Sequence, residues 1–273
     1  MMLEPLPVRT RICRGESLDS YSRRHSAHNH CAPADIDRAL RERGILTTKS
    51  RHRLERLQAW RKLGALPDTA FTTPERVHDE LVTDRALCRR CSGGEPARGR
   101  LPDIGMVCLR HRQWLGSPQA NLHDYHPALA AERHFRRDLA TRNILHDSLP
   151  MLIGRDCASP AIIGPAEIAH RHQQSGITDA WALTYPEQVN IARLLARPSF
   201  LRAVSDPDTD ETERHALTAE QVEMIIPARG DADPWRATNR VWLAITHLTA
   251  RRRDARIYGV PIRDTYYNIL RLI

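Results

Sequence analysis

The feature that most constrains this chain is a pair of short Cys/His motifs in its first half. Two residues separate Cys88 from Cys91, and, after an interval of sixteen residues, two residues separate Cys108 from His111. Each short spacing brings two side chains to one side of a tight turn, and the interval lets the two turns face each other. Four such ligands close the tetrahedral shell of a structural metal ion. The spacing therefore predicts one structural Zn²⁺, bound by these four side chains.

The segment that carries these ligands cannot form a hydrophobic core of its own. It is rich in residues that favour turns, namely Gly93, Gly94, Pro96, Gly99, Pro102 and Gly105. Segments of this composition need an additional stabilising interaction, and the binding energy of the metal would supply it. We expect the six cysteines of the chain to be reduced thiols, because a cytosolic chain rarely carries a disulfide framework.

A catalytic interpretation of the same cysteines is a nucleobase deaminase. His78 and Glu80 would supply its H-x-E element ahead of the first C-x2-C pair. Only seven residues separate Glu80 from Cys88, and the second ligand pair would go unused. The sequence contains no H-E-x-x-H, P-loop or G-x-S-x-G motif. We therefore expect a protein that is not an enzyme, and we interpret the histidines near Cys31 as helix-face side chains rather than a second metal site.

The chain is basic, and nearly all of its base is arginine. Its 273 residues carry 41 Lys+Arg against 33 Asp+Glu, a net charge of +8, and Lys49 and Lys62 are the only lysines. A GC-rich genome accounts for part of this arginine use. The charge also suits a partner rich in phosphate, which the guanidinium fork grips with two hydrogen bonds. Double-stranded DNA is the expected partner. No apolar stretch approaches the length of a membrane span or a signal peptide, so we expect a cytoplasmic protein.

Hydrophobic periodicity predicts a mostly α, multi-helix fold. Ser17 is the expected N-cap of the first helix, and Thr218 with Gln221 forms a capping-box signature for a late one. The expected helices are 17–29, 33–44, 49–63, a short helix from Thr73-Pro74, 127–147, 165–174, 186–196, 219–226 and 234–253. We predict three parts: a helical, helix-turn-helix-like part at 1–86, a zinc finger at 87–118, and a helical domain at 119–273 with an acidic loop near 205–213.

Two groups of basic residues are candidates for contact with nucleic acid. The helix expected at 49–63 follows another helix after a short turn, as in a helix-turn-helix. Leu54, Leu57 and Trp60 should face inward there, while the basic side chains project elsewhere. The second group flanks the metal ligands, which would present it rigidly to phosphate. Together these candidates are Lys49, Arg51, Arg53, Arg56, Arg89, Arg90, Arg110 and Arg112.

With these features placed, the N-terminal half resembles the TniQ family of transposition proteins. The similarity lies in Leu6-Pro7, in the Gly15-Glu16-Ser17-Leu18 element with the Arg-rich helix behind it, and in the finger of three cysteines and one histidine followed by Trp114-Leu115. The resemblance covers roughly residues 6–115. It implies a helical protein with a helix-turn-helix element and structural zinc that links target-site recognition to transposition machinery. A transposition ATPase or a CRISPR effector protein would then be a partner. The chain departs from the family pattern in having no second C-x2-C pair.

Two functions fit these residues. The first is a non-catalytic, zinc-stabilised, DNA-associated protein that links target DNA recognition to transposition or other mobile-element machinery. The second is a sequence-specific transcriptional regulator, such as a prophage or plasmid repressor, that binds operator DNA. A regulator usually binds two half-sites as a homodimer, whereas an adaptor binds DNA weakly and grips a protein partner.

Overall fold

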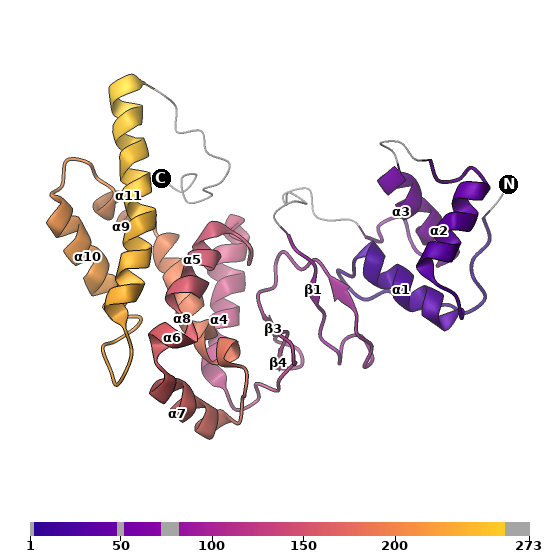
Figure 1. The fold of residues 1–273 in the computed structure, drawn as a ribbon, viewed down its shortest axis with the longest axis horizontal. Coiled ribbons are helices and arrows are strands. Elements are labelled where there is room, and N and C mark those ends of the chain that lie inside the picture. Colours follow the sequence, from indigo (N-terminus) through magenta and orange to yellow (C-terminus); the bar gives the residue numbers. More distant parts are fainter. Residues whose placement is uncertain (1–2, 48–51, 72–81, 260–273) are drawn as a thin grey trace. The chain divides into compact units, whose positions relative to one another are not determined.

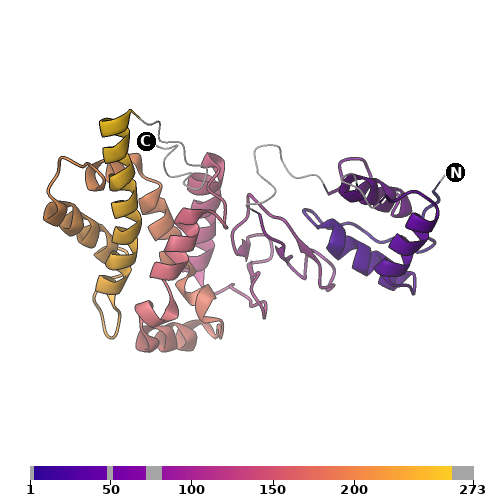
Figure 2. The same ribbon diagram turned by 45° about the horizontal axis from the view of Figure 1, so that its top comes forward.

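The computed structural model describes residues 3–47, 52–71 and 82–259, with only the backbone described at His52 and Arg53. Within these ranges the fold is mostly helical, as the periodicity predicted (Figures 1 and 2). The chain divides into two compact units, an N-terminal unit, Met1–Leu101, and a C-terminal unit, Pro102–Ile273. None of the described helices is both long enough and apolar enough to cross a membrane.

Three helices and a short hairpin build the N-terminal unit. The elements are α1 (Leu18–His28), α2 (Pro33–Glu42), α3 (His52–Leu63), β1 (Arg85–Ala86) and β2 (Arg98–Gly99), the two strands being antiparallel. Ser17 caps α1 as predicted, since its hydroxyl accepts a hydrogen bond from the Ser20 amide. The small core of this unit comprises Leu40, Leu46, Ala59, Trp60 and Leu63.

The predicted inner face of α3 is correct at Trp60 and wrong at Leu54. Trp60 is fully buried, whereas Leu54 is 56% exposed. The buried Leu63 lies nine positions after Leu54, and at 3.6 residues per turn this places the two about 180° apart around the helix. Leu54, Leu57, Trp60 and Leu63 are each three residues apart. Because a helical turn takes 3.6 residues, positions with this spacing drift around the helix, so they cannot all face the core. The helix predicted from Thr73 lies outside the described residues.

The C-terminal unit is a helical bundle preceded by a short hairpin. Its strands are β3 (Val107–Cys108) and β4 (Gln113–Trp114), which pair antiparallel. The helices are α4 (His126–His134), α5 (Leu149–Cys157), α6 (Pro160–Ile163), α7 (Pro165–Ser175), α8 (Ala180–Leu195), α9 (Pro198–Val204), α10 (Glu211–Glu223) and α11 (Pro234–Tyr258). A π-helical segment, Phe135–Leu139, and a 3-10 turn, Ala140–Arg142, continue α4 to a left-handed residue, Asn143. The predicted single helix at 127–147 therefore ends early.

Helix α8 is the centre of the C-terminal unit because it serves two cores. Tyr185 and Val189 belong to a core that also holds Val107 and Trp114 of the hairpin. Ile191 and Leu195 belong to a second core with α9, α10 and α11. A helix that is apolar on both sides is buried between layers, and this one links the hairpin to the rest of its unit.

Three further predicted helix boundaries in this unit are wrong. Helix α8 begins at Ala180, where Asp179 caps it, and the predicted start, Pro186, lies inside the helix. Helix α10 begins at Glu211, not after Thr218, because Asp210 caps it by accepting hydrogen bonds from the amides of Thr212 and Glu213. Thr218 lies buried in the middle of α10 and donates its hydroxyl proton to the carbonyl of Arg214. The second half of the acidic run at 205–213 is thus a helix start, where acidic side chains complement the helix dipole. Helix α11 also continues past the predicted end to Tyr258.

Candidate metal centre

The four side chains predicted to bind metal lie together. The ligand atoms of Cys88, Cys91, Cys108 and His111 are all within 4.8 Å of one another. In a tetrahedral zinc site with Zn–S bonds of about 2.3 Å, two sulfur ligands stand about 3.8 Å apart. The Sγ of Cys108 and the Nδ1 of His111 are separated by 3.8 Å. The cluster could therefore hold one metal ion after a small inward movement, and it is the one such group among the described residues.

The Cys88–Cys91 turn is shaped by backbone hydrogen bonds and glycine. The Ser92 amide donates to the Cys88 carbonyl at 3.1 Å, and the Gly94 amide donates to the Arg89 carbonyl at 2.7 Å. Gly93 and Gly94 have positive φ angles of 67° and 93°, which glycine adopts without strain. The turn follows β1 directly, so the first ligand lies at the end of a strand. The backbone conformation of this turn therefore favours glycine at positions 93 and 94.

The Gly15–Leu18 element fixes the β1–β2 hairpin that carries these cysteines. The Ser17 amide donates to the Arg98 carbonyl at 3.0 Å, and the Arg98 amide donates to the Ser20 hydroxyl at 2.8 Å. The Arg100 amide donates to the Gly15 carbonyl at 2.8 Å. A Cβ atom at Gly99 would lie 2.0 Å from the Gly15 carbonyl oxygen. This close backbone approach explains why glycine occurs at position 99.

Glu16 is the buried acid of this element. Its carboxylate accepts hydrogen bonds from the Ser20 hydroxyl at 3.0 Å, the Arg24 guanidinium at 2.8 Å and the Cys13 amide at 3.0 Å. Arg24 also forms an ion pair with Glu95, which lies between the Cys88–Cys91 turn and β2. The motif that carries the family resemblance thus has a structural role, since it connects α1 to the hairpin of the first ligand pair.

The Cys108–His111 pair belongs to the β3–β4 hairpin, which a buried carboxylate anchors. The Oε1 of Glu132 accepts from the Gly105 amide at 3.0 Å, and its Oε2 accepts from the Val107 amide at 3.2 Å and the Tyr185 hydroxyl at 2.9 Å. Arg136 donates both to Glu132 at 2.7 Å and to the Val107 carbonyl at 2.8 Å. Burial raises the pKa of the Glu132 carboxyl above its usual range, while the Arg136 guanidinium opposes that rise.

Trp114 fixes the other strand of the same hairpin. Its indole Nε1 donates to Asp179 at 2.6 Å, and its ring packs edge-on against Tyr185 with a centroid separation of 5.4 Å. Residues from α4 and α8, together with the N-cap of α8, therefore hold both strands. Glu132, Asp179 and Tyr185 were not predicted as site residues. One sequence feature could have identified Glu132: it is a charged residue beside Ala128, Ala131 and Phe135 on the inner face of its helix.

The arginines beside the ligands are exposed, as the prediction of phosphate contact requires. Arg89, Arg90, Arg110 and Arg112 all have exposed side chains. Arg112 has a positive φ of 48° and contacts the ring of His123 at 2.8 Å. Two arginines therefore accompany each ligand pair.

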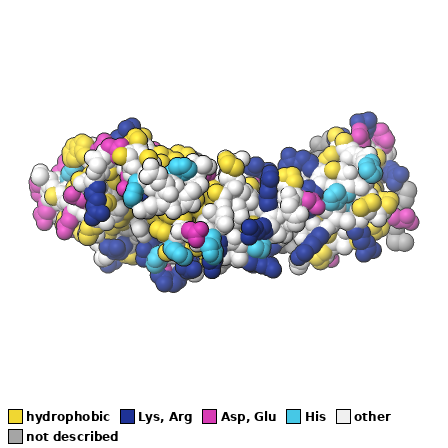
Figure 3. Space-filling view, turned by 90° about the horizontal axis from the view of Figure 1, so that it is seen from below, with side chains coloured by type: hydrophobic (Ala, Val, Ile, Leu, Met, Phe, Trp, Pro, Cys, Tyr) yellow, Lys and Arg dark blue, Asp and Glu magenta, His cyan; other side chains and the backbone are white. Residues whose placement is uncertain are grey.

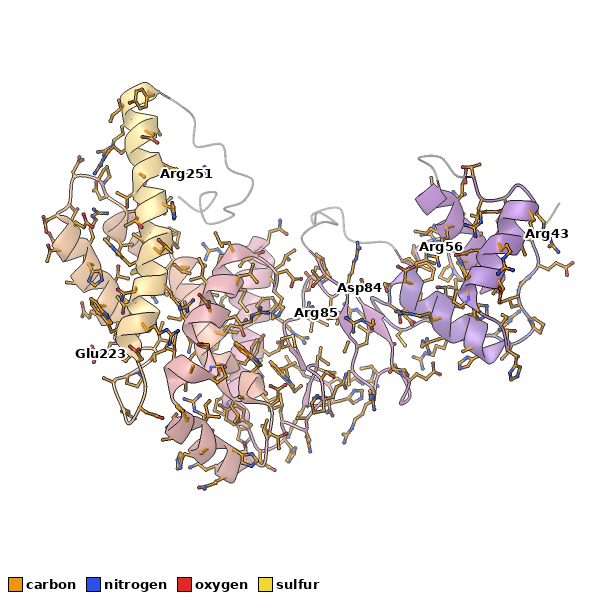
Figure 4. All side chains as sticks on the ribbon, viewed as in Figure 1. Arg43, Arg56, Asp84, Arg85, Glu223 and Arg251 are labelled. Carbon is orange, nitrogen blue, oxygen red and sulfur yellow. The ribbon has the colours of Figure 1, made fainter. Side chains whose placement is uncertain are left out.

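The other candidates for nucleic-acid contact lie on or before α3. Lys49 and Arg51 fall outside the described residues, as does the side chain of Arg53. Arg56, labelled in Figure 4, is engaged within the N-terminal unit. It donates to Asp37 at 2.8 Å and to Asp19 at 2.7 Å, and its side chain is 17% exposed. Its guanidinium also lies over the ring of Trp60, 6.0 Å from the centroid.

The basic excess of the chain belongs mainly to the N-terminal unit. Residues 1–101 contain 20 Lys+Arg and 13 Asp+Glu, a net charge of +7, whereas residues 102–273 contain 21 and 20, a net charge of +1. In Figure 3, dark blue Lys and Arg side chains form scattered patches among the white and yellow atoms of the face in view, and magenta Asp and Glu atoms cover less of it. The electrostatic attraction for a polyanion is therefore concentrated in residues 1–101.

Comparison with known proteins identifies no relative. No family model matches the chain, and no curated protein or solved structure matches it either. The deaminase interpretation involves His78 and Glu80, which lie outside the described residues.

Proposed function

We propose that this protein is a non-catalytic, zinc-stabilised DNA-binding protein that links recognition of target DNA to transposition or other mobile-element machinery. The observation that supports the proposal best is the ligand cluster with its exposed arginines. A metal ion there would immobilise two turns, each of which carries two guanidinium groups. Rigid presentation reduces the conformational entropy that arginine side chains lose on binding phosphate.

Zinc is the proposed metal because of the donor set. Three thiolates and one imidazole are soft and borderline ligands, which select Zn²⁺ over the hard cations Mg²⁺ and Ca²⁺. When bound, zinc would supply a folding constraint rather than a reactive water, since four protein ligands close its shell. The residues that would hold it are Cys88, Cys91, Cys108 and His111.

The transposition context rests on the resemblance to the TniQ family. Two features of that resemblance lie in one unit: the Gly15–Leu18 element is hydrogen-bonded to β2, and the first cysteine pair lies in the loop between β1 and β2. This arrangement supports treating them as parts of one functional module. In this context an ATPase or CRISPR effector would be the protein partner, and DNA contact would be mainly to phosphates.

The test is a salt titration of binding to duplex DNA of unrelated sequence. The variant Arg89→Ala/Arg90→Ala should weaken binding and reduce the slope of log K against log salt by about 2, one for each lost phosphate contact. The charge-matched control is Arg229→Ala/Arg236→Ala, in which two exposed arginines away from the ligands are removed. Its slope should be unchanged.

Three results would count against the proposal. Wild-type protein with no salt-sensitive affinity for DNA would remove the DNA-binding role. Equal slopes for the two double variants would move the contact away from the ligand cluster. A strong preference for one palindromic site, bound by a dimer, would favour the transcriptional regulator instead.

A further inference from the structure

The C-terminal unit contains a pocket that the proposed function does not use. The pocket has a volume of about 610 Å³ and lies where the segment after α4, the end of α8 and the end of α10 meet. Glu223, labelled in Figure 4, marks the end of α10 beside it. Volumes of this size suit small molecules or single units of a polymer.

This pocket is much more positively charged than the C-terminal unit as a whole. Residues 102–273 are nearly balanced, with 21 Lys+Arg and 20 Asp+Glu. The pocket is lined by one carboxylate, Asp138, and by four arginines, namely Arg137, Arg142, Arg193 and Arg197. A hydrogen bond from Arg137 holds the pKa of Asp138 below its usual range, so that this carboxylate stays charged. The charged side chains that line the pocket therefore have a net charge of +3.

Two of the four arginines are available for a ligand. Arg137 and Arg193 share Asp138, at 2.6 and 2.9 Å. Arg197 makes a hydrogen bond of 3.4 Å to a neutral partner, Gln221, and Arg142 is exposed. Both line the same pocket, and neither forms an ion pair with a carboxylate among the described residues. Guanidinium groups in this situation are suited to bind phosphate through two parallel hydrogen bonds each.

The rest of the lining is apolar. Leu139, Leu194 and Ala196 are buried beneath the pocket, while Met224 is 65% exposed at its edge. A methionine thioether makes favourable contacts with aromatic rings. Arginines beside an apolar, sulfur-containing wall therefore match a ligand with a phosphate group at one end and a flat ring at the other.

We propose that this pocket binds a nucleotide unit, with the phosphate at Arg142 and Arg197 and the base against Met224. The unit is either a free nucleotide or one residue of a nucleic-acid strand, since both offer the same chemistry. This inference does not depend on the proposed role of the metal-flanking arginines, which belong to different elements.

The experiment is calorimetric titration of the full-length protein at low salt with four probes: adenosine triphosphate, a short oligothymidylate strand, pyrophosphate and a polyglutamate peptide of similar charge. Arg142→Ala/Arg197→Ala should weaken binding of the nucleotide probe at least tenfold. The control Arg229→Ala/Arg236→Ala removes the same charge from exposed positions outside the pocket and should change the affinity less than twofold. Met224→Ser should weaken the nucleotide probes about threefold while leaving pyrophosphate unaffected, because it removes apolar contact and no charge.

The outcomes separate the sources of the ligand. Binding of adenosine triphosphate alone identifies a free nucleotide, and tighter binding of the oligonucleotide identifies a nucleic-acid strand; both support the site if the pocket variant loses them. If neither adenosine triphosphate nor the oligonucleotide binds, the proposal is overturned. Equal affinity of the pocket variant and the control, or polyglutamate binding as tight as the nucleotide probes, also overturns it.

Discussion

Arg56 and Arg90 carry the same charge in very different surroundings. Arg56 joins two carboxylates and covers Trp60, whereas Arg90 is exposed in the turn between two ligand cysteines. From the sequence, both were candidates for DNA contact. Charge and helix periodicity could not show that Arg56 forms an ion pair with Asp37, nineteen residues earlier in the chain. A cluster of arginines can be predicted from sequence, but the arginines that are engaged inside the protein cannot.

The two arginines should therefore respond differently to substitution. Arg56→Ala should lower the free energy of unfolding of the N-terminal unit by about 1–3 kcal/mol, because it leaves Asp37 without its guanidinium partner and uncovers an aromatic ring. Arg90→Ala should change stability by less than about 0.5 kcal/mol while weakening DNA binding. Urea denaturation followed by tryptophan fluorescence measures the first effect. Equal stability of the two variants would contradict this assignment.

Glu132 supports the β3–β4 hairpin by accepting hydrogen bonds from the amides of Gly105 and Val107. Glu132→Ala should destabilise the C-terminal unit by about 3 kcal/mol, since it leaves the Arg136 charge and two backbone amides without their acceptor. It should also weaken metal binding, because the turn of Cys108 and His111 loses its support. Glu132→Gln keeps the volume but places an amide where only acceptors fit, so an intermediate loss is expected. Denaturation measures the change in stability, and a zinc competition assay with a chromophoric chelator measures the change in zinc affinity. If neither changes, the β3–β4 hairpin does not depend on Glu132.

His25 makes the stability of the N-terminal unit depend on pH. Its ring is fully buried, with Nδ1 3.0 Å from the Thr10 hydroxyl and Nε2 3.1 Å from the Leu63 carbonyl. Burial lowers the pKa of His25 below its usual value. Below pH ~6.5 the unfolded chain then binds a proton that the folded state resists, so stability falls as pH falls through this range. His25→Gln should be less stable at neutral pH and lose less on acidification to about pH 5.5; a parallel loss in both proteins would exclude His25 as the cause.

At the scale of elements, some helix starts could be predicted from local chemistry, whereas others, and the buried face of α3, could not. Ser17 and Pro33 mark the beginnings of α1 and α2 through local chemistry, a cap hydroxyl and a fixed φ. The start of α10 was missed because Thr218 has the same local signature as a cap but lies inside a helix already begun at Asp210. The exposure of Leu54 was missed because the buried face of a helix depends on what packs against it.

The close approach of β2 to the Gly15–Leu18 element gives a prediction at this scale. Gly99→Ala should destabilise the N-terminal unit by about 3 kcal/mol, because its Cβ would meet backbone atoms that cannot move independently. Gly44→Ala is the matched control. Gly44 has a positive φ of 69° but no atom near its Cβ position, so it should cost only the left-handed strain of about 1 kcal/mol. Thermal unfolding of the two variants measures the difference, and a Gly44 variant that is the less stable one would contradict the packing argument.

For the whole molecule, the helical class and the proximity of Cys88, Cys91, Cys108 and His111 could be predicted from sequence, because both depend on short, regular spacings. The parts that support the ligands could not be predicted. Glu132, Asp179 and Tyr185 contact the β3–β4 hairpin from distant positions along the chain, and no local pattern marks such pairs. The pocket with four arginines is likewise assembled from three separate elements.

The proposed structure depends above all on one zinc ion in the four-residue cluster, and native mass spectrometry of the purified protein counts the bound metal. We predict one zinc per chain in the wild type and none in Cys91→Ser. Cys31→Ser, a substitution of a cysteine outside the cluster, should retain the metal. A wild-type chain without zinc, or a Cys91→Ser chain that keeps it, would show that the cluster is not a zinc site.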